Sequence, residues 1–195
     1  MFRHATLVVV LCSLLSSLAN AEERVLFKFD APQAAQAWQT VNDGVMGGRS
    51  VGRFKLNDEQ NMEFYGNLSL QNNGGFASVR ARGKQLSMAS GDVIVARVKG
   101  DGREYKFNVY ADRNLRGYSF RQAFKTKANE WIEVEFPVNS FVATWRGRNF
   151  PNQKLDPGNV SGLGFLLGDK KPGPFKLEVA WVKVRSPQVE VSKVQ

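Results

Sequence analysis

The feature that most constrains the fold of this chain is the strict alternation of apolar and polar side chains along short segments. Tyr105, Phe107 and Val109, for example, are separated by Lys106 and Asn108. A period of two residues is the signature of a β-strand that is buried on one face only. The alternation is found at residues 62–70, 76–82, 92–99, 105–110, 118–124, 131–136 and 175–182. We therefore expect an all-β protein.

Turn-forming residues separate these segments and divide the chain into many short strands. Such residues cluster at positions 73–75, 99–102, 129–130, 156–158 and 171–174, where they favour changes of chain direction. Only residues 32–38 (PQAAQAW) have a helical pattern. Roughly ten short strands with such punctuation predict a β-sandwich of the jelly-roll type. Residues 22–195 contain no linker or repeat, so we expect one domain with a short polar C-terminal tail.

The first 21 residues have the pattern of a secretory signal peptide. A basic start at residues 1–4 precedes an apolar run at residues 7–18, and Ala19-Asn20-Ala21 places small residues before a cleavage site. The run is too short for a membrane-spanning helix, which needs roughly 20 apolar residues. We expect residues 1–21 to be cleaved near Ala21, no transmembrane segment in the mature chain, and a periplasmic or secreted protein.

Cleavage would remove the only cysteine and the only histidine, Cys12 and His4. Zinc sites depend on these side chains, and histidine is the commonest general base. The mature chain would therefore lack disulfides, thiol nucleophiles and Ser-His or Cys-His pairs. Glu133 and Glu135 share a strand face opposite Ile132, which indicates a solvated face rather than a glycosidase pair. The aspartates show no calcium-loop spacing, so we expect no enzyme activity, no metal and no cofactor.

The mature chain would carry a net charge of +8 (26 − 18), because Arg3 leaves with the signal peptide and 26 basic and 18 acidic residues remain. Such a charge favours an anionic partner: an acidic protein face, an anionic lipid surface or an acidic glycan. The basic residues do not cluster with interleaved aromatic residues, as nucleic-acid-binding proteins require. We therefore expect no nucleic-acid partner.

One glycine-rich motif, NDGVMGGRS, occupies residues 42–50. It lacks the Lys-Ser or Lys-Thr pair of a phosphate-binding loop, and a strand rather than a helix follows it. Glycine permits sharp turns, and Asn and Asp side chains fix turns by bonding nearby amides. A structural turn is the favoured reading, and a ligand or partner site is the alternative. The expected turn residues are Gly44, Gly47 and Gly48, and the candidate binding residues are Asn42 and Asp43.

A second motif, NNGGFASVR, occupies residues 72–80. Asn73, Gly74 and Gly75 predict a hairpin-type turn, and Phe76 and Arg80 share one face of the strand that follows. Arg80 has two readings, because a guanidinium binds carboxylates well. It is paired with an internal acid such as Asp43, or it forms the positive floor of a groove together with Arg121.

A third candidate is the segment Trp145-Arg146-Gly147-Arg148, which joins an aromatic ring to two guanidinium groups in an expected loop. Trp and Arg are enriched in binding hot spots, and aromatic rings stack on sugars. The equally weighted alternative is a Trp that closes the edge of the core. Packing roles are expected for the other tryptophans, Trp38, Trp131 and Trp181.

The order of these motifs resembles that of the complex I intermediate-associated protein 30 family. NDGVMGGRS and NNGGFASVR are followed by GDG at residues 100–102, W-x-x-V-x-F-P at 131–137, F-x-x-x-x-R-G at 141–147 and GLGFLLGDKKPGPFKLEV at 162–179. The resemblance covers nearly the whole mature chain. It implies a galactose-binding-domain-like jelly roll and kinship with a mitochondrial factor that helps to assemble respiratory complex I.

The leading hypothesis is a non-enzymatic binding module, a protein-assembly or chaperone-like factor that acts in the periplasm on an acidic or membrane-associated protein partner. The alternative is a carbohydrate-binding module that recognises an envelope or extracellular glycan. A carboxylate-dependent hydrolase ranks third.

Overall fold

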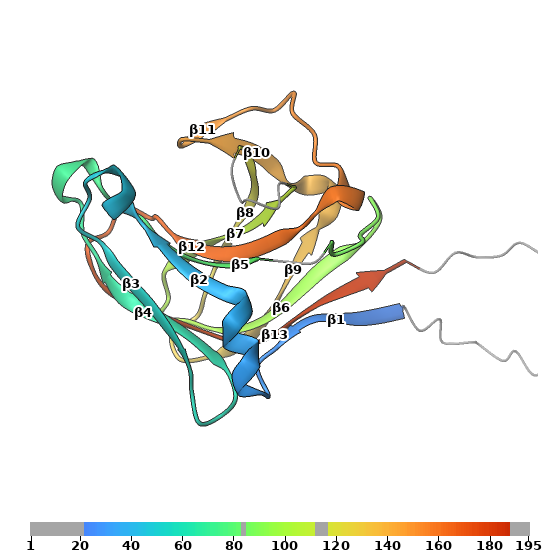
Figure 1. Ribbon diagram of the computed structural model, residues 1–195, viewed down its shortest axis with the longest axis horizontal. Coiled ribbons are helices and arrows are strands. Elements are labelled where there is room, and N and C mark those ends of the chain that lie inside the picture. Colours follow the sequence, from blue (N-terminus) through green and yellow to red (C-terminus); the bar gives the residue numbers. More distant parts are fainter. Residues whose placement is uncertain (1–21, 83–84, 112–116, 188–195) are drawn as a thin grey trace, which may run out of the picture.

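Two antiparallel β-sheets pack face to face in the computed structural model, which describes residues 22–82, 85–111 and 117–187 (Figure 1). The expected signal peptide, residues 1–21, and residues 188–195 of the expected tail lie outside the described residues. The all-β jelly-roll sandwich predicted from alternation is confirmed. Across the described ranges, helices are confined to short 3-10 segments, and none has the length and apolar character needed to cross a membrane.

The first sheet has six strands in the order β3-β4-β13-β6-β9, and β1 pairs with β13 as well. Its strands are β1 (Glu22–Lys28), β3 (Val51–Leu56), β4 (Met62–Leu68), β6 (Val93–Lys99), β9 (Trp131–Pro137) and β13 (Gly173–Ser186). The long strand β13 is the spine of this sheet. Its first half pairs with β4, its second half pairs with β1, and β6 runs along its other edge.

The second sheet has seven strands in the order β11-β10-β8-β7-β12-β5-β2. Its strands are β2 (Trp38–Asn42), β5 (Ala77–Arg82), β7 (Glu104–Tyr110), β8 (Ser119–Lys125), β10 (Val142–Trp145), β11 (Arg148–Asn149) and β12 (Gly162–Leu167). Five 3-10 helices connect strands in the described ranges: η1 (Pro32–Ala37), η2 (Asp43–Met46), η3 (Gln71–Asn73), η4 (Val138–Ser140) and η5 (Pro157–Asn159). The predicted helical segment at 32–38 is thus η1, and Trp38 already begins β2.

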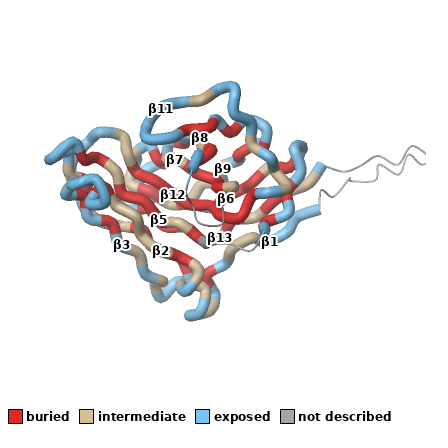
Figure 2. Tube along the Cα trace, turned by 45° about the horizontal axis from the view of Figure 1, so that its top comes forward, coloured by how far each residue is buried: buried red, intermediate tan, exposed pale blue. Residues whose placement is uncertain are grey.

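The hydrophobic core lies between the two sheets, where the buried stretches of both converge (Figure 2). Tyr105, Phe107 and Val109 of β7 are fully buried, as their alternation predicts. Phe107 stacks on Phe136 of the opposite sheet with ring centroids 4.5 Å apart. Burying a side chain of this size contributes roughly 1.5–3 kcal/mol, so these inward faces hold the two sheets together. The alternate residues of each strand face outward.

The predicted hairpin at Asn73-Gly74-Gly75 is wrong. The strands on either side of it, β4 and β5, belong to different sheets, so the segment carries the chain across the edge of the sandwich. The turn chemistry is present, because Asn73 has φ 56° and Gly75 has φ 120°. Leu70, which the alternation places inward, lies beyond the end of β4 and is exposed for this reason.

Candidate functional site

The carboxylate of Asp43 joins the two glycine-rich motifs. Asp43 is completely buried. Its oxygens accept hydrogen bonds from the backbone N–H of Ser50 at 2.8 Å and its hydroxyl at 2.6 Å. They also accept the N–H groups of Gly75 at 2.6 Å and Phe76 at 3.2 Å. Burial acts to raise the pKa of Asp43, but these hydrogen bonds outweigh it and hold the pKa below its usual value. Asp43 is therefore a structural link.

Two glycines are required by the close approach of this carboxylate. A Cβ atom on Gly48 would lie 2.4 Å from the carboxyl carbon of Asp43, and one on Gly74 would lie 2.5 Å from Oδ2. Gly47 ends η2 with φ 86°, a conformation that favours glycine. Gly44 has open space around it and no such φ. The structure thus explains Gly47 and Gly48 as turn residues of NDGVMGGRS, whereas it shows no requirement for glycine at position 44.

Asn42 also serves the turn rather than a cavity. Its side-chain Nδ2 donates to the carbonyl oxygen of Gly52 at 3.1 Å, which ties β2 to β3 across the sandwich edge. Several residues of the motif are exposed, and among them Met46 lines the groove described next.

A groove of about 670 Å³ lies on the outer face of the seven-stranded sheet. Its lining includes the side chains of Arg80, Lys106, Tyr110, Arg121, Thr144 and Trp145. The strand register explains why they meet. Gly164 of β12 lies opposite both Arg80 of β5 and Asn108 of β7, and Asn108 lies opposite Arg121 of β8. Arg80 and Arg121 therefore stand in one row across the sheet.

The charges that line this groove are all positive. Its cationic residues are Arg80, Lys106, Arg121, Arg146 and Lys170, and no Asp or Glu is among the described residues that line it. Within the described ranges, none of the five forms an ion pair. The outer face of the six-stranded sheet is different, because Arg97 pairs with Glu133 at 3.6 Å and Lys99 with Glu178 at 3.2 Å. The groove thus brings together five cations that have no ion-pair partner among the described residues.

Arg80 crosses the floor of the groove. Its Nε donates to the hydroxyl of Ser78 at 3.1 Å, and its guanidinium carbon lies 5.3 Å from the centroid of the Tyr110 ring. The predicted pairing of Arg80 with Asp43 is wrong, because Asp43 is occupied by Ser50 and the backbone of the next motif. A Cβ on Gly164 would lie 2.4 Å from the carbonyl oxygen of Val79 and 3.3 Å from Cγ of Arg80, so glycine at this position permits the close approach of β5.

Arg121 approaches from the opposite side of β7. Its Nη2 donates to the hydroxyl of Ser119 at 2.7 Å, whereas its buried Nε has no partner among the described residues. Burial lowers the pKa of Arg121, and the charge of Arg80 acts in the same direction while Tyr110 opposes it. Burial likewise lowers the pKa of Lys106, with Arg121 adding to the effect. The arrangement holds like charges together in a partly dry site.

Trp145 lies in a tight hairpin at the other end of the groove. Trp145 pairs with Arg148 across the β10–β11 turn, and Arg146 and Gly147 have the positive φ values of 48° and 80° that such two-residue turns use. The indole is 46% exposed and lines the groove, with the Arg146 guanidinium carbon 4.9 Å from its ring centroid. Arg148 is exposed on β11 and is not part of the lining.

The sequence predicted some of the residues that line the groove and missed others. Asn73, Phe76, Arg80, Arg121, Trp145 and Arg146 line the groove, whereas Asn42, Asp43 and Arg148 do not. Lys106, Tyr110 and Lys170 were missed. Lys106 and Tyr110 were detectable, because the alternation of residues 105–110 places both on the outer strand face.

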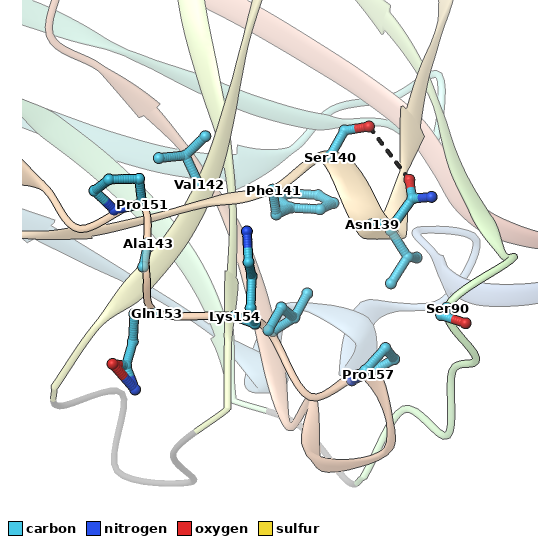
Figure 3. Close-up of a pocket in the computed structure, with 12 residues that line it drawn as sticks. Ser90, Asn139, Ser140, Phe141, Val142, Ala143, Pro151, Gln153, Lys154 and Pro157 are labelled. Carbon is cyan, nitrogen blue, oxygen red and sulfur yellow. Dashed lines mark hydrogen bonds between the residues drawn. The ribbon is translucent and has the colours of Figure 1, made fainter.

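A second, smaller cavity of about 350 Å³ lies beside β10 (Figure 3). It opens between η4 and the loop that leads from β11 to η5, with the ring of Phe141 and the side chain of Lys154 on its walls. Lys154 is its one charged lining residue within the described part of the chain. The lining of this cavity mixes apolar and polar residues without grouped ionisable side chains, so it is the weaker candidate.

The described residues also contain no group of three or more His, Cys, Asp or Glu side chains placed to hold a metal ion. The paired glutamates Glu133 and Glu135 are exposed on β9 and bind Arg97 and Arg185, at 3.6 and 2.5 Å. They lie on the sheet opposite to the groove.

Comparison with known proteins gives one family and one fold. The sequence model of the family described as Complex I intermediate-associated protein 30 matches residues 27–179. The mitochondrial proteins of that name from Mus musculus and Drosophila melanogaster are 27% and 26% identical over 87% and 83% of this chain. The chain spans only 58% and 62% of their lengths.

The solved structures include a similar β-sandwich. The family 11 carbohydrate-binding module of a cellulosomal cellulase from Clostridium thermocellum matches with a TM-score of 0.65. The match covers 89% of this chain and 99% of that one, at 16% sequence identity. At this identity the likeness shows the shared galactose-binding-like jelly roll and nothing about ligands.

Proposed function

Because this chain belongs to the Complex I intermediate-associated protein 30 family, we propose that it is a non-enzymatic binding module that holds a protein partner in the groove. The family relatives are named for association with an intermediate of complex I, which supports a role in protein assembly. The respiratory complex itself is not part of the proposal, since the chain spans only part of those relatives.

The observation that carries the proposal is the groove of unpaired positive charge on the seven-stranded sheet. Its volume of about 670 Å³ lies within the usual range for ligand sites, roughly 300–1,000 Å³. Arg and Trp, which dominate binding hot spots, stand at its floor and at one end. The absence of histidine and cysteine from residues 22–195 supports binding rather than catalysis.

The place of action in the proposal is the periplasm or the space outside the cell. It rests on the signal-peptide pattern of residues 1–21. The mass of the protein isolated from its own cells tests this part alone. A chain that begins at Glu22 and is recovered with the envelope or the medium is the expected result. An uncut chain in the cytosol would overturn the localisation.

A crosslinking pulldown tests the binding role. The bait is the tagged mature protein in its own cell envelope, compared with the groove variant Arg80→Ala/Arg121→Ala. The matched control is Arg97→Ala/Lys183→Ala, which removes the same charge from the outer face of the six-stranded sheet. We expect defined proteins to be lost with the groove variant and kept with the control. Partners retained by both variants, or background proteins alone, would overturn the proposal.

Carbohydrate binding is the second candidate. It is favoured by the half-exposed ring of Trp145 in the groove and by the carbohydrate-binding module among the similar structures. Titration calorimetry with envelope glycans, repeated with Trp145→Ala, tests it. Heat of binding that disappears in the variant would support the candidate. An absence of binding to the wild type would exclude carbohydrate binding. Binding unchanged in Trp145→Ala would exclude Trp145 as its site.

A further inference from the structure

We propose that the occupant of the groove is an acidic, partly apolar polypeptide segment that places a carboxylate between Arg80 and Arg121. The inference deepens the proposed function and rests on it. The partner is acidic, and its carboxylate is recognised between Arg80 and Arg121.

The first argument is the uncompensated charge at the centre of the groove. Arg80 from β5 and Arg121 from β8 stand in one row across β12 and β7, and the Arg80 guanidinium carbon lies 5.3 Å from the centroid of the Tyr110 ring. Nε of Arg121 is buried without a partner among the described residues. Buried polar groups are normally satisfied, so this spot is chemically incomplete. A carboxylate accepts several guanidinium N–H bonds and offsets the repulsion between the two arginines.

The second argument concerns the aromatic rings of the groove. A neutral sugar binds most simply by stacking on an open aromatic face. Here the face of Tyr110 is covered by the Arg80 guanidinium at 5.3 Å, and a face of Trp145 is covered by that of Arg146 at 4.9 Å. A neutral sugar that stacks on either of these ring faces would have to displace the cation that covers it. The groove therefore fits an anion better than a neutral glycan.

The third argument separates a polypeptide from an acidic glycan. Apolar side chains are exposed along the groove: Met46 is 64% exposed, Val142 40% and Trp145 46%. Exposed apolar groups next to a charged site indicate a surface that becomes covered. A polypeptide can present carboxylates to the arginines and apolar side chains to these three residues at once. A glycan of uronic acids offers carboxylates and the faces of its rings, but no aliphatic side chains for Met46 and Val142.

Binding of defined probes tests the inference. Fluorescence anisotropy measures the affinity of a short synthetic peptide that mixes Glu and Leu, of its Glu-to-Gln counterpart, and of oligogalacturonate. The proteins are the mature wild type, the groove variant Arg80→Ala/Arg121→Ala and the control Arg97→Ala/Lys183→Ala. If the groove variant does not keep the melting temperature of the wild type, the single variant Lys106→Gln takes its place.

We expect the Glu-Leu peptide to bind the wild type and the control alike, and the groove variant roughly tenfold more weakly or worse. The Glu-to-Gln peptide should lose a similar factor, and added salt should weaken the Glu-Leu complex. Equal binding of the two peptides, or unchanged binding by the groove variant, would overturn the inference. Tighter binding of oligogalacturonate than of the peptide would overturn it in favour of an acidic glycan.

Failure of this inference can be distinguished from failure of the proposed function. If the groove variant loses its crosslinked envelope partners while neither peptide binds the wild type, the binding module stands and the acidic occupant falls. If the pulldown finds no groove-dependent partner and the peptide does not bind, both proposals fall.

Discussion

Arg103 and Asp169 form a two-point ion pair, with Nε donating to Oδ2 at 3.0 Å and Nη2 donating to Oδ1 at 2.7 Å. The pair is largely buried. Arg103 follows the GDG turn before β7, and Asp169 belongs to the GDKK segment after β12. Arg103 also donates to the carbonyl oxygen of Pro174 at 3.0 Å. One arginine thus fastens two connections of the sandwich that are far apart in the sequence.

Breaking this pair should weaken the fold. Asp169→Asn leaves the Arg103 charge buried without its carboxylate, so we expect the free energy of unfolding to fall by about 3 kcal/mol. Urea denaturation followed by circular dichroism measures it. The control is Glu130→Gln, which breaks the exposed Lys127–Glu130 pair and should cost less than about 1 kcal/mol. Equal losses in both variants would contradict the assignment.

Acid should unfold the protein through its buried aspartates. Burial acts to raise the pKa of Asp43 and of Asp169, but hydrogen bonds and, at Asp169, the charge of Arg103 hold both below the ordinary 3.8. Because the folded-state pKa is the lower one, the stabilisation is complete above pH 3.8 and is lost as the pH falls through the folded-state values. Urea titrations at a series of acidic pH values check this, and Asp169→Asn should show a shallower pH dependence than the wild type.

Two glycines of NDGVMGGRS provide a matched test of the turn. Gly47→Val places a branched side chain at φ 86° and should destabilise the fold by roughly 1–3 kcal/mol. Gly44→Val in the same motif meets open space and should cost about 0.5 kcal/mol. Melting temperature and urea midpoint give both values. A normal stability of Gly47→Val combined with lost partner binding would make the motif a binding site.

Arg121 should matter for binding and not for stability. Its guanidinium is partly buried with no described carboxylate beside it, so Arg121→Met removes an unfavourable charge. We expect the melting temperature to stay the same or rise, while partner binding is lost. The comparison is Arg103→Met, which should destabilise because Arg103 has a buried partner. A loss of about 2 kcal/mol or more in Arg121→Met would mean that Arg121 holds the sheet together.

The alternation of side chains predicted most of the sandwich, and its failures have physical causes. Strands β4 to β9 and β13 were found because each has one buried and one outer face. β12 was missed because all six of its residues are buried. A central strand covered on both faces has no period of two.

The candidate site was only partly predictable for a similar reason. The turn at Asn73-Gly74-Gly75 marks where the chain changes direction, but local chemistry does not say which sheet the next strand joins. The predicted pairing of Arg80 with Asp43 is wrong because the Asp43 carboxylate is bound by Ser50 and by the amides of Gly75 and Phe76. The row that joins Arg80 to Arg121 depends on the order β5-β12-β7-β8, which no single segment encodes.

The pairing of β1 with β13 has a consequence for how the protein is made. The first and last described strands are neighbours, and β13 also supports β4 and β6. The six-stranded sheet therefore cannot assemble while the chain is still being synthesised up to residue 173, and contacts of such long sequence separation form slowly. We therefore expect the six-stranded sheet to be completed only after β13 has been synthesised.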